Sequence, residues 1–134
     1  MKTTTALIIL FGLGLFTFFV FRGGGPNMQP TESASISANT NVSIVNGQQI
    51  VLIKAKGGYR PEVSEVKAGI PTVIRFETKA TYDCSSIIRI PSLGIDQDLP
   101  ASGQTDVAVG SLSAGTLQGS CGMGMYRFTL NVKG

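Results

Sequence analysis

Short apolar runs separated by turn residues fill the chain from about residue 42 onward. The runs are rich in β-branched and aromatic residues, and breaks such as Asn46-Gly47, Gly57-Gly58 and Ala114-Gly115 separate them. No stretch of this region shows the 3.6-residue period of an amphipathic helix. The pattern predicts strands at residues 42–45, 49–55, 72–78, 84–90, 105–109 and 126–132. Short strands at this density favour an all-β fold, an antiparallel sandwich or barrel.

The last predicted strand has the clearest phase. Tyr126, Phe128, Leu130 and Val132 alternate with polar residues, which assigns one face of the strand to the core and the other to solvent. The preceding residues 119–125 contain too much glycine for a strand interior. They are predicted to form a loop that presents sulfur-containing side chains at one end of the sandwich.

The first 22 residues follow a different pattern. Residues 3–21 carry no charge, are strongly apolar from Ala6 onward and lie between Lys2 and Arg22. A helix of ~19 residues would be about 28 Å long, close to the hydrocarbon thickness of a bilayer. Residues 1–22 are therefore predicted to form a transmembrane anchor. A cleaved signal peptide is the alternative, but the apolar run is longer than usual for one and no A-x-A-like site follows.

A predicted linker separates this anchor from the β-region. Residues 23–41 are rich in Gly, Pro, Ser, Thr and Asn, and cannot bury enough surface to fold. Residues 42–134 then form the one domain for which the chain has room. A short N-terminal tail before a long C-terminal domain favours a single-pass protein of the cell membrane with its domain on the extracytoplasmic side.

Charge and missing residue types exclude several functions. The net charge is +3, and the basic residues are interleaved with acids, so no nucleic-acid interface is expected. The chain contains no histidine, which removes the commonest general base and metal ligand. It shows no catalytic triad, phosphate-binding glycine loop or paired carboxylates, so we do not expect an enzyme. Asp96 and Asp98 are interpreted as solvated charges.

The glycine-rich loop carries the candidate metal ligands. Cys121, Met123 and Met125 are spaced two residues apart, which would aim all three side chains to one side of an extended segment. Thiolate and thioether sulfurs select Cu(I) over hard cations, whereas zinc has little use for methionine. A blue-copper centre needs two histidines and cannot be assembled here. Cys84 is the second candidate cysteine, and a strand start and a later loop can meet at one end of a sandwich.

Two other interpretations stay open at this point. Cys84 and Cys121 are the only cysteines, so they could instead form one disulfide in a structural or adhesive β-sandwich without metal. The two methionines of the loop have no purpose in that interpretation. An electron-transfer or oxidase role is the third, and the absence of histidine argues against it.

The motifs also resemble a known family. Gly58-Tyr59-Arg60-Pro61 and Val66-Lys67-Ala68-Gly69-Ile70-Pro71 resemble the opening of cupredoxin-like domains. Asp83-Cys84-Ser85, Pro91-Ser92-Leu93-Gly94-Ile95 and Cys121-Gly122-Met123-Gly124-Met125 then follow in the order of a histidine-less branch. With the anchor in front, the chain is similar to the membrane-anchored cupredoxin copper(I) chaperones of Gram-positive bacteria.

The resemblance covers roughly residues 57–132 and carries specific implications. It implies a Greek-key β-sandwich with the metal at the loop end, where Cys84 takes the place of the first histidine of a blue-copper protein. Cys121, Met123 and Met125 match the remaining ligands, and the site would hold up to two Cu(I) ions with bridging thiolates. The implied partner is a copper-exporting P-type ATPase, and the implied role is copper resistance outside the membrane. Tyr59, Pro61, Pro71 and Phe76 are interpreted as core and turn residues.

Overall fold

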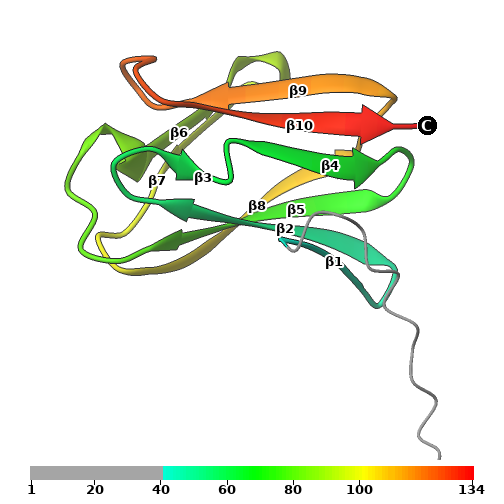
Figure 1. Cartoon of the computed structure of the whole chain (residues 1–134), viewed down its shortest axis with the longest axis horizontal. Helices are drawn as coiled ribbons and strands as arrows, with labels where there is room; N and C mark the ends of the chain where they lie inside the picture. Colours follow the sequence, from blue (N-terminus) through cyan, green and yellow to red (C-terminus); the bar gives the residue numbers. More distant parts are fainter. Residues whose placement is uncertain (1–40) are drawn as a thin grey trace, which may run out of the picture. The chain divides into compact units, whose positions relative to one another are not determined.

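Alternating apolar residues build two β-sheets that face each other (Figure 1). The computed structural model describes residues 41–134. Sheet A contains β1 (Val42–Val45), β2 (Gln48–Ala55), β3 (Tyr59–Arg60), β5 (Pro71–Thr78) and β8 (Gly103–Ser111). Sheet B contains β4 (Val63–Lys67), β6 (Ile87–Ile90), β7 (Ile95–Asp98), β9 (Gly115–Ser120) and β10 (Arg127–Lys133). Two 3₁₀ turns, η1 (Cys84–Ser86) and η2 (Pro91–Leu93), flank β6.

Both sheets are mixed, which corrects the prediction of antiparallel pairing throughout. Sheet A has the order β1-β2-β5-β8, with β3 on β2, and β2 pairs with β5 in parallel. Sheet B has the order β4-β10-β9-β6-β7, and β4 pairs with β10 in parallel. The reason is connectivity: between β2 and β5 the chain crosses to sheet B as β4, so β5 returns beside β2 in the same direction.

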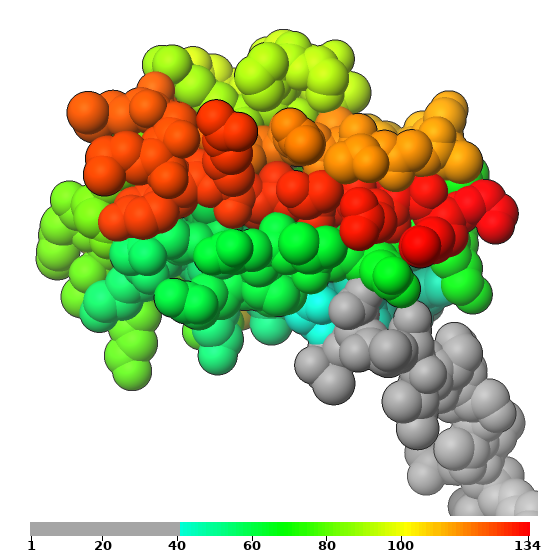
Figure 2. Space-filling model, turned by 45° about the horizontal axis from the view of Figure 1, so that its top comes forward, coloured from blue at the N-terminus to red at the C-terminus, as the bar shows by residue number. Residues whose placement is uncertain are grey.

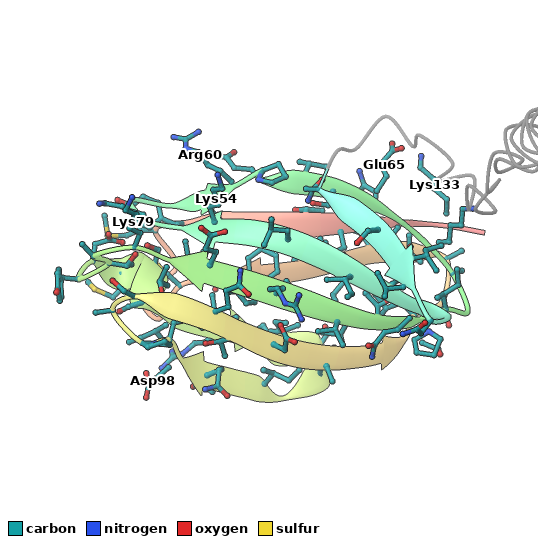
Figure 3. The ribbon with its side chains drawn as sticks, turned by 90° about the horizontal axis from the view of Figure 1, so that it is seen from below. Lys54, Arg60, Glu65, Lys79, Asp98 and Lys133 are labelled. Atoms are coloured by element: carbon teal, nitrogen blue, oxygen red, sulfur yellow. A yellow bond between two sulfur atoms is a disulfide. The ribbon has the colours of Figure 1, made fainter. Side chains whose placement is uncertain are left out.

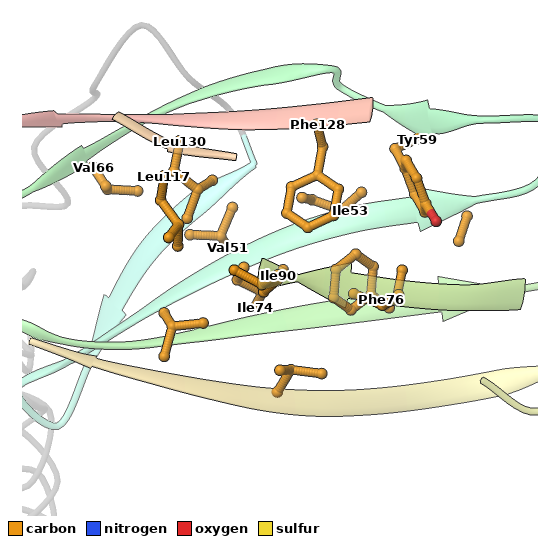
Figure 4. Close-up of a cluster of buried hydrophobic side chains, with 14 of the residues drawn as sticks. Val51, Ile53, Tyr59, Val66, Ile74, Phe76, Ile90, Leu117, Phe128 and Leu130 are labelled. Carbon is orange, nitrogen blue, oxygen red and sulfur yellow. The ribbon is translucent and has the colours of Figure 1, made fainter. Parts of the chain in front are cut away.

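The space between the sheets is filled by aliphatic side chains around three aromatic rings (Figure 4). Tyr59, Phe76 and Phe128 pack edge to face, with centroid distances of 5.2 Å for Tyr59–Phe128 and 5.4 Å for Phe76–Phe128. Such pairs add about 0.5–1.5 kcal/mol each beyond the area they bury. The predicted phase of the last strand is confirmed, because Phe128, Leu130 and Val132 are all buried.

The predicted strands at residues 42–45, 49–55, 72–78 and 105–109 are confirmed with small differences at their ends. The prediction of a strand over residues 84–90 is wrong in its first half, because residues 84–86 form η1. The Asp83 side chain accepts a hydrogen bond from the backbone N–H of Ser85 and so caps a 3₁₀ turn. Strands β3, β4, β7 and β9 were not among the six predicted from the apolar pattern.

The predicted anchor at residues 1–22 and all but the last residue of the predicted linker lie outside the described residues. Within residues 41–134, no helix has the length and apolar character needed to cross a membrane. The positions of the anchor and the linker stay predictions.

Candidate metal centre

The loops that carry the four predicted ligands lie at one end of the sandwich. The connections β2–β3, β5–β6 and β9–β10 meet there, at the left of Figure 1, whereas the C-terminus lies at the opposite end. Cys84 lies in the β5–β6 connection, and Cys121, Met123 and Met125 lie in the β9–β10 connection.

Cys84 is held by the η1 turn and its cap. Asp83 Oδ1 accepts from the N–H of Ser85 at 2.8 Å and also from the Ser85 hydroxyl. Its other oxygen, Oδ2, accepts from the N–H of Gly57 at 3.0 Å. The Ser85 hydroxyl above all, with these backbone donors, holds the pKa of Asp83 below its usual range, although partial burial opposes the shift. Asp83 therefore ties the turn that carries Cys84 to the β2–β3 loop.

Tyr59 supports the same region from the core. Its hydroxyl donates to the carbonyl oxygen of Ile87, the first residue of β6, at 2.9 Å. Burial raises the pKa of Tyr59 far above its usual range, and the negative charge of Asp83 adds to the effect. The phenol therefore stays protonated and remains a hydrogen-bond donor across the physiological pH range.

The Cys121 loop is closed by its own backbone. The N–H of Cys121 donates to the carbonyl oxygen of Tyr126 at 3.0 Å, and its carbonyl accepts from Gly124 at 2.9 Å. Gly124 has a φ of +73°, a left-handed conformation that favours glycine. Arg89 donates to the carbonyl oxygen of Gly122 at 3.1 Å and pairs with Asp96 at 3.2 Å, which fixes the loop to β6 and β7.

The structure joins Cys84 and Cys121 in a disulfide, with a Cα–Cα distance of 5.7 Å across a sequence separation of 37. Two cysteines from separate connections are thus brought together, as disulfide partners rather than as free thiols. Cys121 is buried, and Cys84 is half-buried against the core. The N–H of Tyr126 is directed at Cys121 Sγ at 3.5 Å.

The two methionines are placed differently from the cysteines. Met123 and Met125 are 80% and 66% exposed, whereas Cys121 is 1% exposed. The segment is not extended, because the loop turns between Cys121 and Gly124, so the spacing of two residues does not by itself align the three side chains. The methionines are therefore not core residues, and their thioethers are accessible from solvent.

The donor set decides which metals could fit. Within residues 41–134, no three side chains among His, Cys, Asp and Glu gather closely enough to hold a metal ion. A metal at this end would therefore depend on the two cysteines, once reduced, together with methionine sulfur. Such a set suits a soft d¹⁰ ion and does not suit zinc, calcium or Cu(II).

Sequence reasoning missed the residues that support this end of the fold. Asp83, Arg89 and Tyr126 each contact the ligand-bearing segments through hydrogen bonds. Tyr82, two residues before Cys84, has a side chain that is 83% exposed. The signal for Asp83 was its position before Cys84-Ser85, a typical capping arrangement.

Comparison with known proteins identifies the family of the chain. The family model of the cupredoxin-like domain matches residues 31–132. The chain belongs to this cupredoxin-like family. No curated protein matches the chain.

Two solved structures share the fold at moderate identity. One is a copper-binding protein solved by NMR in the apo form, with 29% identity and a TM-score of 0.64; the match covers 69% of this chain and 94% of that one. The other is the metal-binding domain of the Cu(I)-exporting P-type ATPase CopA of Streptococcus pneumoniae D39, solved with Cu(I). Its identity is 26% and its TM-score 0.63, over 69% of this chain and 93% of that one.

Proposed function

We propose that this cupredoxin-like protein binds Cu(I) as cargo and serves as a copper chaperone or buffer. The observation that carries the proposal is the meeting of the chain's only two cysteines beside a loop with two exposed methionines. The similarity to a copper-binding protein and to a Cu(I)-containing ATPase domain supports it. The proposed ligands are Cys84, Cys121, Met123 and Met125.

The cysteines would bind copper only in their reduced form. An external dithiol reductant would supply the two electrons and two protons that convert the disulfide into two thiols, and would itself become a disulfide; Cu(I) binding would then displace the thiol protons. Two thiolates can bridge two Cu(I) ions, so we expect about one to two ions per chain. A thioether needs no deprotonation, and both thioethers are exposed, so the methionine side of the site is suited to exchange with a donor or acceptor.

The proposed place of action is the outer face of a cell membrane. It rests on the predicted anchor at residues 1–22 and the linker at residues 23–41. The proposed exchange partner is a copper-exporting P-type ATPase, which the family resemblance implies. Cu(I) held by this protein would be kept from free solution until transfer. No catalytic step is part of this role.

A competitive titration tests the binding step. The full-length chain in neutral detergent is reduced, freed of reductant without oxygen, and titrated with Cu(I) against a chromogenic Cu(I) chelator. We expect uptake of about one to two equivalents by the wild type, and loss of tight binding in Cys84→Ser, Cys121→Ser. Unchanged uptake by this double variant would refute the proposed site.

The methionines are tested with a substitution that conserves their volume. The double variant Met123→Leu, Met125→Leu should retain the copper held by the thiolates. It should release this copper to the chelator about tenfold more slowly than the wild type, or should lose the second, more weakly bound Cu(I) ion. Met28→Leu is the matched control, because Met28 belongs to the predicted linker. If the control changes copper release as much as the loop variant does, methionines 123 and 125 have no specific role.

The disulfide itself favours one second candidate, a structural β-sandwich without metal. Thiol labelling of protein taken directly from cells, with and without added copper, separates the two. Complete absence of free thiols under both conditions would support the structural role. Labelling with a membrane-impermeant reagent after reduction, in intact cells, tests the extracytoplasmic location at the same time.

A further inference from the structure

Basic side chains gather at the end of the sandwich that carries the metal loop. We define the basic rim as five exposed residues: Lys54, Lys56, Arg60, Lys79 and Arg127. Figure 3 shows three of them, Lys54, Arg60 and Lys79, at the same end of the domain, away from Glu65 and Lys133. Within residues 41–134, the ion pairs involve other basic residues, namely Arg75, Arg89 and Lys133. The positive charges of the rim are therefore available to a partner.

The acids at this end offset this charge only in part. Glu62 is exposed and lies close to Arg60 in sequence, and Figure 3 shows Asp98 at the same end of the domain. The Asp83 carboxylate is already engaged by Ser85 and by the N–H of Gly57. Glu77 lies opposite Lys54 in the β2–β5 pairing and is half-buried. The net charge of +3 for the whole chain is thus unevenly distributed, with an excess of positive charge beside the loop.

A cleft of about 400 Å³ lies within the rim and reaches the metal loop. It is lined by Gly58, Arg60, Glu62, Met125, Tyr126 and Arg127. Figure 2 shows the loop residues in orange directly beside the green residues of β3, which form the opposite wall. Two guanidinium groups, the carboxylate of Glu62 and one exposed thioether therefore share one concave surface, on which positive charge is in excess by one.

We propose that this cleft and its basic rim dock an acidic segment of a protein partner that presents its own sulfur ligand for Cu(I). The proposal rests on the proposed function, and it specifies the partner's chemistry. Carboxylates of the partner would pair with Arg60 and Arg127, which accept bidentate contacts. Met125, in the wall of the same cleft, would then lie next to the partner's ligand.

Charge complementarity of this kind mainly raises the rate of encounter. Opposite charges within about 10 Å attract at low ionic strength and are screened as salt is added. A fast encounter suits an exchange protein, because transfer of a tightly held ion requires a short-lived complex in the correct orientation. An anionic lipid surface could also attract the rim. A concave cleft fits a projecting peptide better than a flat headgroup layer.

The test uses two labelled peptides and the full-length chain in neutral detergent, copper-free and with its disulfide intact. One peptide carries two methionines among aspartates and glutamates, and the other has lysines in place of the acids. Fluorescence anisotropy should show that the acidic peptide binds at least about tenfold more tightly, and that this preference shrinks in high salt. Because no copper is present, the result does not depend on the metal site.

Variants locate the binding surface. Arg60→Glu, Arg127→Glu should abolish the preference, and the milder Arg60→Gln, Arg127→Gln should reduce it. Lys67→Glu, Lys133→Glu is the control for net charge, because it reverses the same number of charges and the two exposed lysines pair in register at the opposite end. The circular dichroism spectrum of each variant confirms that it is folded, and an unchanged Cu(I) affinity separates docking from metal binding.

Three results would overturn the proposal. Equal binding of both peptides would show that charge is not recognised. An equal loss of preference in Lys67→Glu, Lys133→Glu would show that only net charge counts. Stronger capture by anionic vesicles than by the acidic peptide, through the same two arginines, would make the rim a lipid contact.

Discussion

Gly119 offers the sharpest test of how the core positions the loop that carries Cys121. It lies in β9 two residues before Cys121 and pairs in register with Phe128 of β10. A Cβ added at this position would meet three atoms of the Phe128 ring at 2.1, 2.4 and 2.8 Å. Carbon atoms in contact prefer about 3.5–4.0 Å, so the ring would have to move by more than ~1 Å. The Phe128 ring lies over Gly119 and occupies the space that a side chain at this position would need.

The ring has little room to move. Phe128 is buried and packs against Tyr59 and Phe76, at centroid distances of 5.2 and 5.4 Å. Overpacking of a filled core costs about 1–3 kcal/mol, and this contact is at the severe end. Gly119→Ala should therefore lower the free energy of unfolding by about 3 kcal/mol, enough to lower Tm by roughly 12–24 °C in a domain of this size.

Urea denaturation followed by circular dichroism, with the disulfide intact, measures this change. Gly122→Ala is the control in the same hairpin, because its added Cβ would lie 3.4 Å from Ile87 and meet less crowding. Combining Gly119→Ala with Phe128→Leu should cost less than the sum of the single variants, since the smaller side chain relieves the clash. If the free energy of unfolding of Gly119→Ala stays within about 0.5 kcal/mol of the wild-type value, the Phe128 ring is not held in place as argued.

Three further predictions concern the hydrogen bonds and the sulfur bridge. Buried Gln49 donates a hydrogen bond to the Thr72 hydroxyl at 3.0 Å and accepts one from the N–H of Lys67 at 2.9 Å. Gln49→Leu should therefore lower the free energy of unfolding by about 2–3 kcal/mol in urea denaturation, whereas the exposed Gln48→Leu should change it little. The lowered pKa of Asp83 means that its carboxylate stabilises the fold above the unfolded-state pKa of about 3.9, and this contribution is lost as pH falls through the folded pKa. The Tm of Asp83→Asn, measured from pH 7 down to about 2, should therefore fall less steeply than that of the wild type, and parallel curves would contradict this. Reduction of the copper-free protein should cost about 4 kcal/mol, as expected for a sequence separation of 37, and added Cu(I) should restore part of the lost Tm.

The sequence predicted the strands whose apolar residues alternate clearly, and it missed those in which the pattern is broken. In β4 one of the two buried positions is taken by Ser64, which accepts a hydrogen bond from Asn41 at 2.8 Å. In β9 one of the two buried positions is Gly119, which lies under the ring of Phe128 across the hairpin. A polar or glycine residue facing the core gives no apolar signal. Parallel pairing was equally hidden, because it depends on which sheet the chain enters next.

For the candidate site, the sequence indicated which segments carry the sulfur-containing residues but not how their side chains are oriented. The spacing of Cys121, Met123 and Met125 identified the loop, and Cys84 was the only possible second cysteine. The direction of each side chain could not be predicted, because it depends on the turn that Gly124 closes with the carbonyl of Cys121. The supporting bonds from Arg89 to Gly122 and from Asp83 to Gly57 join segments far apart in the sequence.

The four sulfur-containing side chains differ in how far they are exposed to solvent, and this difference bears on the proposed exchange of copper. Cys121 is buried with an N–H donor directed at its sulfur, Cys84 is half-buried, and Met125 and Met123 face solvent. Thiolates bind Cu(I) more strongly than thioethers, and burial slows exchange with solvent ligands, so a bound ion would be retained at the inner side. The exposed thioethers can meet a partner's ligand before the inner bonds break. If the proposed function holds, a ligand-by-ligand transfer through Met125 would require no opening of the sandwich, and a partner would approach at the cleft beside Met125.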